Sequence, residues 1–234
     1  MTGQLRETLR EWAFTYNDPQ YFQQDPIAFP THFSSLEKRG ERCLKDIEVS
    51  GVFAAHFAWG RRAMIVRDCN RLFDVMDWKP YDYVMKGNWK ADPSSIHRTV
   101  KWCDVASICE RLREYYLGSE SLEDLGTEGI RCRIFGQKQD PKAPDKKIRM
   151  MQRWFVRNDG KVDLGIWKNS SPASLVLPLD VHVYSQATAL GLTQRKQKDL
   201  ATALEITEVF RDIFPEDPCL GDFALFGYGV THGK

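Results

Sequence analysis

The 234-residue sequence contains no apolar run long enough to cross a membrane. Its longest near-apolar stretch, residues 51–60, is interrupted by His56. A membrane-spanning helix needs about 20 consecutive apolar residues. The first seven residues carry both charge signs and lack the apolar centre of a secretory signal. These absences predict a soluble, cytoplasmic protein that has no membrane partner.

Closely spaced cysteine pairs are also missing, and so is a glycine-rich phosphate loop. The six cysteines are scattered with no Cys-x-x-Cys pair, and without a secretory signal we expect them to be reduced. Structural zinc and iron–sulfur sites usually use closely spaced ligands, so we expect no metal and no cofactor. The nearest approach to a phosphate loop, residues 226–229, has no following helix or lysine and is interpreted as a turn.

Helical periodicity, in contrast, runs along nearly the whole chain. Apolar residues recur at helical spacing, and no sustained alternation of apolar and polar residues indicates strands. The pattern predicts an all-α protein with about ten helices in one continuous unit over residues 1–234. Pro26 and Pro30 predict an extended stretch over residues 25–33. The clearest helices are expected over residues 5–17, 46–60, 61–76, 102–117, 146–157, 180–190 and 193–214. Asp46, Asp145 and Asp180 are the expected N-caps of three of them.

A basic segment lies in the second half of the chain. Residues 131–161 contain ten Lys/Arg and only three acidic residues, although the net charge of the whole chain is +1. A basic surface on an otherwise acidic protein is typical of enzymes that contact phosphates. A solvated helix face beside the polar loop of residues 137–145 explains the same charges without a ligand. The charges alone leave both interpretations open.

Two kinds of residue in the second half of the chain have side chains suited to catalysis. Asp180 lies between two apolar stretches, where burial raises the pKa of a carboxyl group, although an N-cap role explains it equally well. Lys146 and Lys147 open the basic helix, close to Arg149 and Arg153. An amine beside other cations and an apolar wall loses its proton more easily, which favours a nucleophilic lysine. The alternative is a pair of ordinary surface lysines.

Short strings along the chain resemble a bacterial and archaeal family of helical proteins whose function is undescribed. They occur in order from about residue 10 to residue 230, so the resemblance covers almost the whole chain. It implies a helical fold and says little about function. The matching strings are residues 25–27, 46–55, 58–61, 97–99, 153–157, 162–167, 178–180 and 222–227.

A second resemblance implies an activity. The string Leu-Pro-Leu-Asp-Val-His-Val at residues 177–183, followed by Leu-Gly-Leu at 190–192, resembles a Val-Asp-Thr-His-Val … Leu-Gly-Leu segment of helix-hairpin-helix DNA glycosylases. The catalytic aspartate of that superfamily corresponds to Asp180. The resemblance implies two helical lobes around a cleft, with the N- and C-terminal helices in one lobe. Residues 46–61 resemble an early helix whose C-terminal end faces substrate, which implies that Trp59 and Arg61 lie near DNA.

The position of the lysine departs from the commonest glycosylases. Those enzymes carry a catalytic lysine after a Gly-x-Gly hairpin, a little under twenty residues before the aspartate, whereas here that interval has no such hairpin. Archaeal 8-oxoguanine glycosylases carry their lysine at the start of a helix, roughly thirty residues before the aspartate. Lys146 matches that arrangement, with Lys147 in reserve.

The resemblance thus implies a base-excision DNA glycosylase that contains no iron–sulfur cluster. Lys146 is the expected nucleophile, Asp180 its electrostatic and acid/base partner, and damaged DNA the partner molecule, with 8-oxoguanine the first substrate to test. A lyase step through a lysine Schiff base is part of the expectation. Arg149, Arg153 and Arg157 are the expected phosphate contacts. The alternatives are a non-catalytic module that binds nucleic acid or a protein partner, and an N-glycosylase acting on RNA or a nucleoside.

Overall fold

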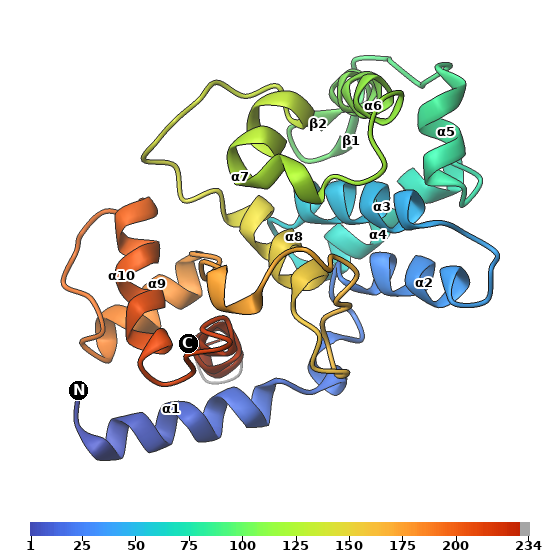
Figure 1. Cartoon of the computed structure of the whole chain (residues 1–234). Coiled ribbons are helices and arrows are strands. Elements are labelled where there is room, and N and C mark those ends of the chain that lie inside the picture. The colour runs from blue at the N-terminus through green and yellow to red at the C-terminus, as the bar shows by residue number, and fades with distance from the viewer. Residues whose placement is uncertain (230–234) are drawn as a thin grey trace. The chain divides into compact units, whose positions relative to one another are not determined.

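The computed structural model describes residues 1–229, most of which are helical, and this confirms the predicted all-α class (Figure 1). The α-helices are α1 (Gly3–Tyr16), α2 (Ala28–Glu37), α3 (Leu44–Phe57), α4 (Arg62–Val75), α5 (Pro80–Lys86), α6 (Trp102–Tyr116), α7 (Gly126–Gly129), α8 (Lys146–Val156), α9 (Val181–Ala189), α10 (Leu200–Arg211) and α11 (Leu220–Asp222). Shorter 3₁₀ or π turns are η1 (Pro19–Phe22), η2 (Glu123–Leu125), η3 (Ile130–Ile134), η4 (Pro172–Ser174) and η5 (Phe223–Gly227). Strands β1 (Ser95–His97) and β2 (Val100–Lys101) form one antiparallel pair.

The chain divides into two compact units. Unit 1 combines residues 1–22 with the chain from residue 140 onward, and unit 2 comprises residues 23–139. The first and last helical segments therefore belong to the same unit although they are far apart in sequence. No helix in the described part of the chain is long and apolar enough to cross a membrane.

In unit 1, the N-terminal helix α1 packs along the C-terminal π-helix η5, as the blue and red segments of Figure 1 show. The rings of Trp12 and Tyr228 stack with their centroids 3.7 Å apart. Gly227 lies so close to Tyr16 that an added Cβ would stand 2.4 Å from its side chain. Absence of a side chain at Gly227 is therefore what allows the two ends of the chain to approach this closely.

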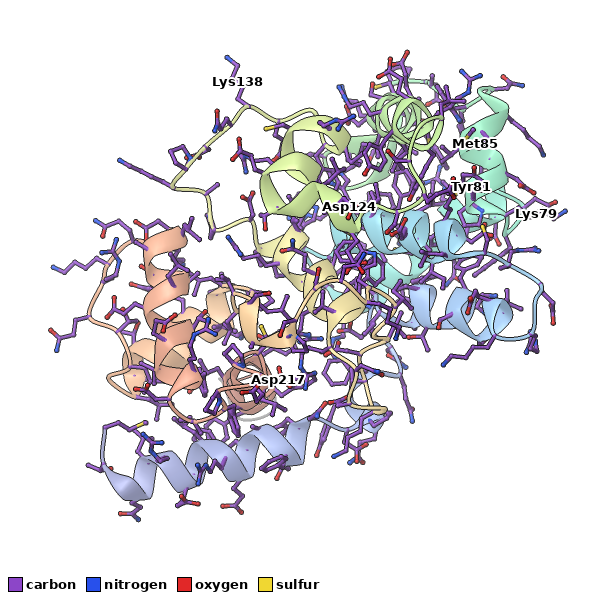
Figure 2. The ribbon with its side chains drawn as sticks, viewed as in Figure 1. Lys79, Tyr81, Met85, Asp124, Lys138 and Asp217 are labelled. Atoms are coloured by element: carbon purple, nitrogen blue, oxygen red, sulfur yellow. The ribbon has the colours of Figure 1, made fainter. Side chains whose placement is uncertain are left out.

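In unit 2, most residues of helix α3 are buried, and they include the fully buried carboxylate of Glu48. The carboxylate of Glu48 accepts hydrogen bonds from the Tyr116 hydroxyl at 2.9 Å, the Ser121 hydroxyl at 2.5 Å and the Leu122 amide at 3.0 Å. The ammonium group of Lys45 lies over the rings of Tyr81 and Tyr116, and Figure 2 labels Tyr81 on α5. The three hydrogen bonds to Glu48 offset the free-energy cost of burying its carboxylate, and they join α3 to α6 and to the segment after α6.

The predicted extended stretch over residues 25–33 is wrong from residue 28 onward. Helix α2 begins at Ala28 and includes Pro30 as its third residue. The first N–H groups of a helix have no partner within the helix, so a proline in the first turn removes no hydrogen bond. The two prolines thus mark the beginning of a helix.

Two helices begin at residues other than those expected. The N-cap of α3 is Cys43, while Asp46 lies in the first turn and accepts a hydrogen bond from the Cys43 amide at 3.2 Å. The late helix α10 begins after Asp199, whose carboxylate accepts a hydrogen bond from the Thr202 amide, and not at Thr193. Residues 226–229, interpreted from sequence as a turn, are helical. Helix α5 was not predicted at all.

Candidate active site

The two candidate lysines occupy the first two positions of α8, whose start agrees with the sequence prediction. Asp145 holds the N-cap position in a left-handed conformation, with φ of 46°, and its side chain makes no capping hydrogen bond. Lys147 lies one and two turns before Met151 and Trp154, which are both buried. Its aliphatic stem thus continues the apolar stripe of α8.

This position changes the acidity of Lys147. Burial, with a smaller contribution from the positive charge of Lys146, lowers the pKa of Lys147 to about 8. Near neutral pH a measurable fraction of its amine is therefore unprotonated, which is the form that attacks an electrophilic carbon. This lowered pKa makes Lys147, the reserve candidate from the sequence, the candidate nucleophile in the structure.

Asp180 is the N-cap of α9, as predicted from sequence, and its Oδ1 accepts a hydrogen bond from the Val183 amide at 2.8 Å. It follows the buried residues Leu177 and Leu179 and is itself half-buried. The carboxylate therefore has one oxygen committed to the helix and lies at the edge of the apolar core of unit 1.

Asp222, the last residue of α11, is a second carboxyl group, and it lies close enough to Asp180 to be affected by its charge. Burial raises the pKa of Asp222 to about 6, an effect that Arg153 opposes and the charge of Asp180 increases. Asp222 also accepts a hydrogen bond from Arg153. Asp222 is not among the site residues predicted from the sequence. The available signal was its position directly before the apolar residues 223–226, where a carboxylate is expected to be shielded from water.

Arg153 and Arg157, expected as phosphate contacts, are instead buried in ion pairs. Arg153 pairs with Asp163 at 3.3 Å and with Asp222, and Arg157 pairs with Asp163 and with Asp217 at 2.8 Å. Figure 2 labels Asp217 beside the C-terminal helical segment of unit 1. Because these guanidinium groups are buried among carboxylates, we assign them a structural role and not one in surface phosphate binding.

The remaining predicted binding residues occupy different positions. Arg149 is half-buried, donates a hydrogen bond from Nε to the Pro144 carbonyl at 3.1 Å, and has a pKa lowered mainly by burial. Trp59 and Arg61 belong to unit 2, where Arg61 is exposed directly before α4 and Trp59 is half-buried. Lys146, Lys147, Arg149 and Asp180 thus belong to the same compact unit.

The cysteines and other potential ligands form no metal site in the part of the chain that the structure describes. All six cysteines are free thiols. No group of three or more His, Cys, Asp or Glu residues among residues 1–229 is placed to hold a metal ion.

A protein-family model described as a protein of unknown function (DUF2400) matches the chain over residues 25–140 and 127–231. The chain belongs to this family. The match agrees with the resemblance, noted from the sequence, to a family of helical proteins of undescribed function. No curated protein and no solved structure matches the chain.

The cap role of Asp180 is separable from any role in chemistry. Asparagine caps a helix about as well as aspartate does, so Asp180→Asn is expected to change the free energy of unfolding by only a few tenths of a kcal/mol. Asp180→Ala removes the capping oxygen and is expected to cost about 1 kcal/mol. Urea denaturation of both variants measures these values. Equal losses would show that the hydrogen bond to Val183 is not what Asp180 contributes to stability.

Proposed function

We propose that this protein is a DNA glycosylase that removes a damaged base and cleaves the resulting site through a lysine Schiff base. The observation that carries the proposal is the pKa of Lys147, lowered to about 8 at the start of a helix in the same compact unit as Asp180. The resemblance of residues 177–192 to a glycosylase segment supports it. We also propose that the protein has the glycosylase fold, in which two helical lobes surround a substrate cleft.

The proposed reaction uses the amine of Lys147 first and the carboxylate of Asp180 second. The neutral amine of Lys147 attacks the sugar C1′, a C–N bond forms, and the glycosidic electron pair leaves with the base, which takes up a proton. Asp180 stabilises the positive charge that develops on the sugar and accepts a proton from the attacking nitrogen. Opening of the sugar ring then gives the Schiff base. Loss of a C2′ proton to a base then breaks the C3′–O bond, so the 3′ phosphate leaves with that electron pair and the strand is cleaved. Water finally hydrolyses the imine and regenerates the lysine.

Recognition of DNA also requires basic residues that are accessible to solvent. With Arg153 and Arg157 assigned to the core, the exposed members of the basic segment include Lys142 and Lys161 in unit 1. Lys138, labelled in Figure 2, is an exposed member in unit 2. We propose that Lys142, Lys161 and Arg149 of unit 1 contact phosphates, while the target base is turned out of the DNA helix.

Borohydride trapping tests the proposal with the full-length protein. Duplexes contain 8-oxoguanine, uracil or an abasic site opposite each of the four bases, and an undamaged duplex is the control. We expect a covalent adduct with at least one damaged duplex and none with the control, because only an imine between the lysine and the sugar leaves the protein bound to the DNA once borohydride has reduced it. Absence of an adduct from every duplex, the abasic one included, would refute the lyase function. Retained, salt-sensitive DNA binding in that case would favour a non-catalytic binding module.

A further inference from the structure

A buried hydrogen-bonded chain in unit 2 holds the turn after α3. His97 is fully buried, and its Nδ1 lies 2.8 Å from Oδ2 of Asp68. Its Nε2 lies 3.0 Å from the backbone carbonyl of Trp59. The other carboxylate oxygen of Asp68 accepts a hydrogen bond from Nε of Arg67 at 2.8 Å. The chain thus links β1 and α4 to the backbone of Trp59 and fixes the position of that residue.

The side chain of Trp59 is fixed as well. The Trp59 ring meets the His97 ring edge-on, with centroids 5.7 Å apart. The guanidinium carbon of Arg98 lies over the Trp59 ring, 4.2 Å from its centroid. Arg98 reaches this position from a left-handed backbone conformation with φ of 53°. Gly60 lies beneath it, where an added Cβ would stand 2.7 Å from Nη1 of Arg98. Because these contacts already order the Arg98 side chain without a ligand, less side-chain entropy is lost when a ligand binds.

The residues around Trp59 and Arg98 include several exposed arginines. Arg98 and Arg61 are exposed, and the side chain of Arg67 is 71 % exposed although it pairs with Asp68. The carboxylate of Asp68 is itself buried, so among these four residues the exposed charges are those of the arginines. A planar guanidinium held over an indole ring, with further arginines nearby in the sequence, suits a ligand that has both flat aromatic groups and phosphates.

We propose that Arg98 and Trp59, flanked by Arg61 and Arg67, form a nucleic-acid contact on unit 2 that stacks on an unpaired base. In this arrangement the base lies on the guanidinium plane of Arg98, which Trp59 supports from the other side. Arg61 and Arg67 contact the neighbouring phosphates. The inference rests on the proposed function only for its choice of DNA as the ligand, because stacking and phosphate contacts need no lysine chemistry.

Fluorescence anisotropy with two undamaged, labelled duplexes tests the proposal on the full-length protein. One duplex is fully paired and the other carries a single unpaired base. We expect the protein to prefer the second duplex. Arg98→Ala is expected to weaken binding to it by about tenfold or more, given what stacking on one base contributes. Arg98→Lys is expected to lose the preference too, because an ammonium group keeps the charge but has no plane to stack.

Variants of the flanking arginines test the phosphate contacts. Arg61→Ala and Arg67→Ala are expected to weaken binding to both duplexes equally and to reduce the slope of log K against log salt by about one each. The matched control is Arg39→Ala, since Arg39 is an exposed arginine of unit 2 that pairs with Glu41 at 2.6 Å. Its removal is expected to leave the preference intact.

The proposal is overturned if the wild-type protein shows no preference for the unpaired base, or if both Arg98 variants retain it. These outcomes are distinguishable from failure of the proposed function. A protein that gives a borohydride adduct but shows no dependence on Arg98 remains a glycosylase without this contact. A protein that gives no adduct but loses the preference in both Arg98 variants has the contact without the chemistry.

Discussion

Replacing Lys147 with glutamine is expected to abolish the borohydride adduct and to lower base excision by more than about a hundredfold. Glutamine has no amine to form an imine, and its length leaves the packing against the α8 stripe nearly unchanged. The side chain of Lys147 is the one whose pKa burial lowers to about 8, so its loss removes the amine best suited to attack. Gel analysis of trapped adducts, with urea denaturation to confirm folding, measures both effects.

Lys146 provides the matched control, because it is the adjacent amine on the same helix. Lys146→Gln is expected to keep the adduct but to move the pH dependence of its formation. In the wild-type protein, adduct formation is expected to rise with pH through about 8 as Lys147 loses its proton. Removing the neighbouring positive charge raises the pKa of Lys147, so the rise is expected at higher pH. Loss of the adduct in Lys146→Gln, with retention in Lys147→Gln, would assign the nucleophile to Lys146 instead.

The sequence predicted the helices that present the candidate site, because their signals are local. Lys146 and Asp180 begin or cap helices at the expected positions, and the apolar spacing of α8 and α9 is contained within each segment. Local patterns failed where several residues can serve as a cap. Asp46 was expected to cap α3, but Cys43 takes that place, and Oδ1 of Asp46 accepts a hydrogen bond from the distant Tyr81 amide.

What the sequence could not show is which charges are neutralised inside the protein. Arg153 and Arg157 have helical spacing and charge suited to a DNA-binding surface, and only the fold places Asp217 and Asp222 against them. The fold alone also brings Asp222 near Asp180, and it places the guanidinium group of Arg98 over the ring of Trp59. Each contact joins segments that are distant in sequence, so neither composition nor periodicity contains it.

Replacing Arg157 with methionine is expected to lower the free energy of unfolding by about 3–5 kcal/mol. The side chain of Arg157 is 1 % exposed, and its Nε lies 2.9 Å from both carboxylate oxygens of Asp217. Its other nitrogens pair with Asp159 at 3.0 Å and with the buried Asp163. Methionine fills similar apolar space but leaves Asp163 with Arg153 as its remaining partner. Urea denaturation measures the loss.

The size of that loss depends on burial, and an exposed ion pair tests this. Arg10 pairs with Glu7 at 3.1 Å, but the two side chains are 41 % and 69 % exposed, so Arg10→Met is expected to cost less than about 1 kcal/mol. Arg157→Lys keeps the charge but not the planar fork that reaches three carboxylates, so its loss is expected to be intermediate. If Arg157→Met cost no more than Arg10→Met, the buried carboxylates would have to be neutralised by protonation or solvent, and Arg157 would not be what holds them.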